Sequence, residues 1–191
     1  MKIAILGWGS LIWQPKDLKI DTSIGDKGWF TDGPLLPIEF ARISKNRRLT
    51  LVIKSDALEQ TTLYAFSIYP TTELAVLDLA LREGTCRNSI GSYERGDNKL
   101  HTAEFGFVKR IKDWLEEHEG IDAVVWTNLG EKMFYENDKA EKVPVTDPIL
   151  YLKGLKGEAS VLAEEYIRKT PKQINTLLRT KIEKELGWLP I

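Results

Sequence analysis

The chain begins with a short apolar run, Ile3 to Leu6, that leads directly into a glycine-containing loop. A continuous apolar run of this length is typical of a buried strand. Gly7 and Gly9 allow the backbone to turn sharply after the strand, so that N–H groups are exposed at the strand end. Such a loop is suited to binding a carboxylate, a phosphate or a developing oxyanion.

Five further segments have patterns that predict strands or connections. Residues 35–43 and 49–54 are apolar and lie on either side of a polar turn, and residues 61–69 alternate well, so each of the three is predicted as a strand. Residues 121–128 form another apolar strand. The segment 21–33 is rich in Gly, Asp and Lys and is predicted as a long surface connection.

Two helices are predicted before residue 120. The first is capped by Thr71 or Thr72 and is stopped by Gly84. It carries three leucines on one face: Leu74, Leu77 and Leu81. The second has apolar residues at helical spacing over 107–115 and ends at Gly120.

The last third of the chain has a helical pattern. From Asp147 onward, apolar residues recur at helical spacing in three segments, the third of which starts at Pro171. Residues 131–144 before it are charged and are predicted as a loop or short excursion. We therefore expect a single α+β domain over 1–191, with a core at about 1–128 and a helical extension at about 147–191.

Composition narrows the classes of partner. The 191 residues are 42% hydrophobic, which is enough for a sizeable core, and 27 Lys and Arg balance 28 Asp and Glu. The balance argues against nucleic acid or an anionic membrane as the partner. No apolar run approaches a membrane span, and the N-terminus begins with a strand instead of a signal peptide, so we expect a cytoplasmic protein.

Cysteine and histidine do not predict a metal site. The single Cys86 excludes an internal disulfide and suggests a reducing compartment. His101 and His118 are far apart and have no cysteine partner at metal-ligand spacing, so a structural zinc site is not expected.

The glycine loop also fails to match a dinucleotide-binding fingerprint. Gly7 and Gly9 follow a strand, but the position of the third glycine is occupied by Ile12. The fingerprint further needs a helix immediately afterwards, and Pro15 disfavours one there.

Three motifs in a characteristic order point to a family instead. They are GWGSLIW at residues 7–13, GPLLPIEFARIS at 33–44, and LDLALREG at 77–84 followed by SYER at 92–95. With these motifs the chain resembles the gamma-glutamylcyclotransferase-like family, which includes the ChaC-type enzymes. The resemblance covers roughly residues 1–100. It implies an α+β fold in which a mixed sheet is curled into a small barrel and flanked by helices, here followed by a C-terminal helical extension.

The resemblance implies roles for seven residues. Glu83 stands where the family has its acid/base glutamate. Four residues stand where the family has its substrate-binding loop, and two fit the strand that follows: Trp8, Gly9, Ser10 and Leu11 in the loop, Tyr93 and Arg95 in the strand. The family has a tyrosine at the position of Trp8. Because the indole has only an N–H donor, any hydrogen bond that the phenol makes in the family is lost in this chain or is replaced by one from the indole N–H.

The implied reaction cyclises a gamma-glutamyl group to 5-oxoproline and releases an amine or amino acid. The α-amino group of the substrate is the nucleophile, so the partner is a small gamma-glutamyl compound and no metal or cofactor is implied. Glu83 would take up a proton and return it to the leaving nitrogen. The N–H groups of Gly9 and Ser10 would bind the carbonyl oxygen or the α-carboxylate.

A second hypothesis keeps the fold but removes the chemistry. Trp8 and the helical extension suggest a non-catalytic small-molecule-binding or regulatory module. The two hypotheses differ in whether the Glu83 carboxylate faces a closed pocket beside the N–H groups of Gly9 and Ser10. The sequence leaves the leaving amine and the oligomeric state open, since an apolar helical face can pack on its own core or on another copy.

Overall fold

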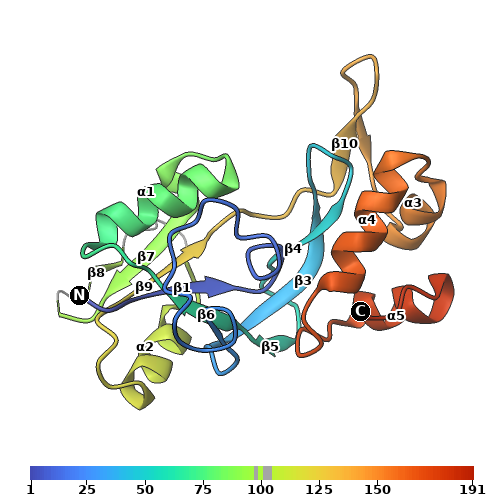
Figure 1. Cartoon of the computed structure of the whole chain (residues 1–191). Coiled ribbons are helices and arrows are strands. Elements are labelled where there is room, and N and C mark those ends of the chain that lie inside the picture. Colours follow the sequence, from blue (N-terminus) through green and yellow to red (C-terminus); the bar gives the residue numbers. More distant parts are fainter. Residues whose placement is uncertain (97–98, 101–104) are drawn as a thin grey trace. The chain divides into compact units, whose positions relative to one another are not determined.

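A computed structural model describes residues 1–96, 99–100 and 105–191. In this part of the chain the fold is α+β, with a mixed β-sheet and five α-helices (Figure 1). The described residues cluster into two compact units. Unit 1 comprises residues 1–36 and 61–129, and unit 2 comprises 37–60 and 130–191. The single domain expected from the sequence stays a prediction.

Unit 1 is built on a six-stranded sheet in the order β2-β6-β1-β9-β7-β8. Its strands are β1 (Ile3–Gly7), β2 (Trp29–Phe30), β6 (Leu63–Phe66), β7 (Ile90–Glu94), β8 (Lys99–Leu100) and β9 (Ala123–Thr127). β1 lies in the middle, antiparallel to β6 and parallel to β9, with Ile5 opposite both Ala65 and Val125. All five residues of β1 are buried, as the apolar run predicted.

The alternation of side chains along β1 gives the sheet two covered faces. Ile3 and Ile5 lie in a core cluster with residues of α1 (Thr72–Glu83). Leu6 points to the opposite face and is paired in register with Tyr64. On that face the Tyr64 ring lies 5.0 Å from the ring of Trp114, which belongs to α2 (Val108–Glu117). Thus α1 and α2 cover opposite faces (Figure 1).

The ends of α1 are those that the sequence predicted. The structure adds which face of the helix packs on the sheet. Thr71 is the N-cap, with its hydroxyl accepting a hydrogen bond from the Leu74 N–H, and Gly84 closes the helix in the left-handed conformation at φ 61°. The three leucines do share a face, but that face is exposed, with Leu81 at 81%. The residues packed on the sheet are smaller on average: Ala75, Val76, Leu79 and Ala80.

Two predicted segments of unit 1 differ in detail. Within 21–33, predicted as a surface connection, Trp29 is buried and pairs with Ala65 as part of β2. The predicted strand 61–69 is shorter, since β6 ends at Phe66. A separate short strand, β5 (Glu59–Thr61), precedes it, and between them Thr62 turns its hydroxyl to donate to the Pro34 carbonyl at 2.8 Å.

Unit 2 contains the predicted strand pair and the helical extension. β3 (Leu35–Ile43) pairs antiparallel with β4 (Leu49–Ile53), and the sheet order is β4-β3-β5. The charged segment 131–144 forms a hairpin of β10 (Phe134–Glu136) and β11 (Lys142–Pro144). Three helices follow, as predicted: α3 (Pro148–Gly154), α4 (Glu158–Lys169) and α5 (Leu177–Leu186). The helix of the third segment starts at Leu177 instead of near Pro171, because Thr176 caps it.

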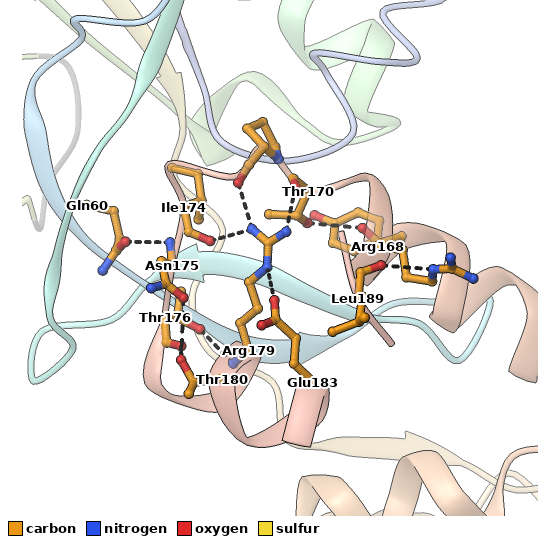
Figure 2. A network of polar contacts seen from close by, with 12 residues as sticks. Gln60, Arg168, Thr170, Ile174, Asn175, Thr176, Arg179, Thr180, Glu183 and Leu189 are labelled. Atoms are coloured by element: carbon orange, nitrogen blue, oxygen red, sulfur yellow. Dashed lines mark hydrogen bonds and ion pairs between the residues drawn. The ribbon is translucent and has the colours of Figure 1, made fainter. Parts of the chain in front are cut away.

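A buried arginine joins the end of α4 to α5, as Figure 2 shows. The Arg179 side chain is 2% exposed, and its Nη1 donates to the carbonyls of Pro171 and Ile174, both at 2.7 Å. Its Nη2 donates to the Thr170 carbonyl at 2.9 Å, and its Nε donates to Glu183 Oε1 at 3.1 Å. Every nitrogen of this guanidinium therefore has an acceptor, mostly carbonyl groups that follow a helix end and need donors.

Candidate active site

The loop after β1 is a single helical turn. The Ile12 N–H donates to the Gly9 carbonyl at 3.1 Å, and the Gln14 N–H donates to the Ser10 carbonyl at 2.9 Å. Trp8 and Leu11 anchor the turn, each at 6% exposure. In a turn of this kind the carbonyls of the first residues accept hydrogen bonds, whereas the N–H groups of the same residues have no acceptor within the turn. The expected donors, the N–H groups of Gly9 and Ser10, are therefore outside the turn's own hydrogen bonds.

Arg82 joins this loop to Glu83. Its Nη1 donates to Glu83 Oε1 at 2.7 Å, and its Nη2 donates to Ser10 Oγ at 3.2 Å and to the Gln14 carbonyl at 2.7 Å. The Arg82 side chain is 6% exposed and that of Glu83 is 19% exposed. The ion pair is thus sheltered from water, and Arg82 links the carboxylate predicted as the acid/base group to the loop predicted to bind substrate.

The end of α1 explains why these charges lie side by side. Arg82 is in the last turn of the helix, where the free carbonyl groups carry a partial negative charge that favours a cation. Glu83 is less favoured there, and the neighbouring guanidinium supplies its counter-ion. Gly84 then ends the helix, which keeps both side chains at the end of α1.

Two buried polar atoms near the end of β1 have no hydrogen-bond partner among the described residues. One is Arg82 Nε, and the other is Thr127 Oγ1. Thr127 is the last residue of β9, which runs parallel to β1, so it lies at the same end of the sheet as the loop. It is paired with Ile90, a member of the core cluster with α1. Buried polar atoms without partners are uncommon in native proteins and mark places where water or a ligand supplies the missing bond.

Tyr93 and Arg95 lie elsewhere in unit 1. Tyr93 is paired with Val124, which is paired with Ala4, so it lies level with the start of β1. The same pairing places Tyr93 on the sheet face opposite Ile5 and α1, where Lys112 of α2 lies 5.5 Å from its ring centroid. The loop, in contrast, follows the end of β1. The structure therefore does not bring Tyr93 to Glu83.

Arg95 has structural partners at that far end. Its Nε donates to the Ile121 carbonyl at 3.1 Å, and its Nη2 donates to the carbonyls of Leu115 and His118. These carbonyls belong to the end of α2 and the turn after it, so Arg95 acts as a cap for that helix. Of the seven predicted site residues, the five at Trp8–Leu11 and Glu83 are brought together, and the other two are not.

The sequence interpretation missed Arg82, Gln14 and Thr127. An arginine before a glutamate at a helix end has the same pattern as a solvated surface pair, and the Gln14 contact uses only the backbone. Cys86, three residues beyond Glu83, is exposed, and a hydrogen bond with the Ser89 hydroxyl lowers the pKa of its thiol. No contact links this thiol to Glu83 or to the loop.

Within the described ranges, no group of three or more His, Cys, Asp and Glu side chains is arranged to hold a metal ion. His118 stacks on Trp114 at 4.4 Å, and its Nε2 lies 3.2 Å from Asp32 Oδ2. His101 lies outside the described residues.

No helix in the described part of the chain is long and apolar enough to cross a membrane. Comparison of the chain with protein-family models, curated proteins and solved structures finds no match. The geometry of the site and the motif resemblance therefore carry the functional argument.

Proposed function

We propose that the protein is a gamma-glutamylcyclotransferase-like enzyme that converts a small gamma-glutamyl compound to 5-oxoproline and an amine or amino acid. The observation that carries the proposal is the link from Glu83 through Arg82 to Ser10 and Gln14, in which each contact is 3.2 Å or shorter. It unites two motifs that lie 72 residues apart in the sequence. The proposal includes the finer fold, a mixed sheet curled into a small barrel, and a cytoplasmic location.

The reaction requires that the protein bind the substrate with its α-amino group close to its γ-carbonyl, accept a proton and stabilise an oxyanion. The α-ammonium of the substrate gives a proton to the Glu83 carboxylate, and the free amine then attacks the γ-carbonyl carbon. The new C–N bond closes a five-membered lactam as the C–N bond to the leaving amine breaks, and the leaving nitrogen takes the proton back from Glu83. The ring nitrogen then gives up its second proton, which passes through Glu83 to the released amine, so that the products are the neutral lactam and an ammonium ion. Holding the two reacting ends together is worth as much as about 7–11 kcal/mol in well-oriented intramolecular systems.

The loop after β1 supplies the oxyanion site in this scheme. The negative charge that develops on the γ-carbonyl oxygen needs preorganised donors, and the N–H groups of Gly9 and Ser10 are of the right kind. Loss of one such donor costs about 3–4 kcal/mol of barrier in enzymes where it has been removed. Trp8 and Leu11, whose side chains are both buried, anchor the turn.

The test is release of 5-oxoproline from a panel of gamma-glutamyl compounds: glutathione, gamma-glutamyl amino acids and gamma-glutamyl amines. Glu83→Gln keeps the shape of the side chain but removes its basicity, so turnover should fall by about 100-fold or more. Glu73→Gln is the matched control, because Glu73 lies on the same helix in a 3.5 Å pair with Arg87 and its side chain is 68% exposed. Equal activity of the two variants would remove Glu83 from the mechanism.

A non-catalytic binding module is the second candidate. The observation that favours it is the role of Arg95 as a cap on α2, because a residue predicted to bind substrate is then engaged elsewhere in the fold. In that case folded protein would release no 5-oxoproline from any member of the panel. A rise in melting temperature with one of the same compounds would then identify what the site binds.

A further inference from the structure

Arg82 differs from the structural arginines of this chain in what it contacts. Arg179, about equally buried, uses every nitrogen, and three of its four acceptors are backbone carbonyls (Figure 2). Arg82 instead donates to a carboxylate and a hydroxyl that belong to the candidate site, and to only one carbonyl. Its Nε is buried without an acceptor among the described residues, as are the Nε atoms of Arg47 and Arg48, so the acceptors of its other two nitrogens are what set Arg82 apart.

The three contacts of Arg82 have a geometric consequence. Glu83 is on α1, whereas Ser10 and Gln14 lie on a loop that follows β1 and contains the two backbone hydrogen bonds of a single turn. The guanidinium is planar and rigid, so it fixes the distance between its acceptors. Together with the buried side chains of Trp8 and Leu11, Arg82 therefore holds the loop relative to the carboxylate.

We infer that Arg82 is a positioning residue that holds the loop at residues 8–14 and the Glu83 carboxylate in one reactive arrangement. This inference rests on the proposed function for its catalytic consequence. In the reaction, the proton acceptor and the oxyanion donors act on two atoms of the same small substrate. A displacement of about 1 Å between such groups costs about 100-fold in rate. Arg82 acts through Glu83 and Ser10 and forms no bond to the reacting atoms.

Lysine and glutamine variants separate charge from geometry. Arg82→Lys keeps the cation but replaces the planar fork by a single ammonium nitrogen on a flexible stem, which does not fix the distance between the carboxylate and the loop. Arg82→Gln removes the charge as well. For both variants we expect kcat to fall by about 100-fold, with KM changed less than about threefold, because positioning acts on the transition state. Arg168→Gln is the control: Arg168 forms a 2.9 Å pair with Glu164 outside the site.

Amide hydrogen exchange gives a readout that does not need turnover. The N–H groups of residues 8–14 should exchange at least about 10-fold faster in Arg82→Gln than in the wild-type chain, with no such change in Arg168→Gln. Ser10→Ala combined with Arg82→Gln should lower kcat/KM no further than Arg82→Gln alone, because the two residues share one contact.

The outcomes separate the two proposals. If the wild-type chain is active and Arg82→Lys restores full kcat, charge alone suffices and the positioning role is overturned. Unchanged exchange in the loop also overturns it, and so does faster exchange spread evenly over the whole chain, which would show a purely structural arginine. If the wild-type chain releases no 5-oxoproline, the proposed function fails, and faster exchange confined to residues 8–14 still supports positioning by Arg82.

Discussion

Arg179→Met tests the energetics of the buried cluster in Figure 2. Methionine fills much of the same space with an unbranched apolar chain but donates no hydrogen bond. The carbonyls of Thr170, Pro171 and Ile174 would then lose the donors that now lie at 2.7–2.9 Å. Glu183, whose side chain is 26% exposed, can turn toward water.

The size of the effect follows from those three carbonyls. Each hydrogen bond from the guanidinium contributes about 1–1.5 kcal/mol net, so the loss should be about 3–4.5 kcal/mol. The lost pair with Glu183 adds little, because it is partly solvated. We therefore expect a destabilisation that is a large fraction of the stability of a typical domain.

The assay is urea unfolding followed by circular dichroism at 222 nm. Arg168→Gln serves as the comparison, since its pair with Glu164 is 35% and 37% exposed and its hydrogen bond to the Leu189 carbonyl, at 3.0 Å, is exposed as well, so that together they should contribute about 1 kcal/mol or less. If the two units unfold in separate steps, the step that shifts should be the one in which α4 and α5 melt. If Arg179→Met lowers the free energy of unfolding by less than about 1 kcal/mol, the three hydrogen bonds to backbone carbonyls do not stabilise the fold as assigned.

Two other substitutions test packing and capping. A Cβ at Gly91 would lie within 2.5 Å of Cζ2 and Nε1 of the fully buried Trp126. Thermal unfolding of Gly91→Ala should therefore show a free energy of unfolding that is lower by about 1–3 kcal/mol. Gly130→Ala is the control and should be nearly neutral, because a Cβ at Gly130 would meet open space. Asp147 caps α3, and the N–H groups of Leu150 and Ile149 hold its pKa below the usual value. Its contribution is fully present above about pH 4 and is lost as the pH falls through the lower folded value. The difference in urea midpoint between Asp147→Ala and the wild-type chain should therefore shrink toward pH 2; a constant difference would show that ionisation has no part in capping.

Local signals in the sequence were enough for the ends of many elements. Thr71 and Gly84 mark the two ends of α1 by side-chain capping and by the left-handed conformation, both of which depend only on neighbouring residues. The burial of the strand that begins at Ile3 could also be predicted locally, because a continuous apolar run is typical of a strand covered on both faces. These features need no knowledge of what packs against them.

Tertiary contacts decided the features that the sequence did not. Leu74, Leu77 and Leu81 have helical spacing as good as that of the buried face, but Ala75 and Ala80 allow closer contact with the sheet. β2 is only two residues long and lies in a polar segment, so its pairing with β6 is invisible to any periodicity.

The residues of the candidate site that the structure brings together lie close to element boundaries, and the contacts that depend on register were missed. Glu83 and the loop at Ser10 were assigned to the candidate site by the family resemblance, and each lies next to a glycine near the end of an element. Tyr93 follows from a motif, but its face and level on the sheet are set by its pairing with Val124, a residue 31 positions away. Arg82 was overlooked because its partners are known only from the fold.

The interleaving of the two units has a consequence for how the chain folds as it is made. β1 pairs with β9 through Ile3 and Ala123, which are 120 residues apart, so one edge of the first strand stays open until about two thirds of the chain has been synthesised. The sheet of β3, β4 and β5 has all of its strands by residue 61 but waits longer for the rest of its unit, which begins at residue 130. Open strand edges are prone to aggregation, and pairing over such long separations is slow. The nascent chain therefore carries one sheet with an open strand edge and a second sheet without the rest of its unit, a period in which a chaperone would have the most to protect.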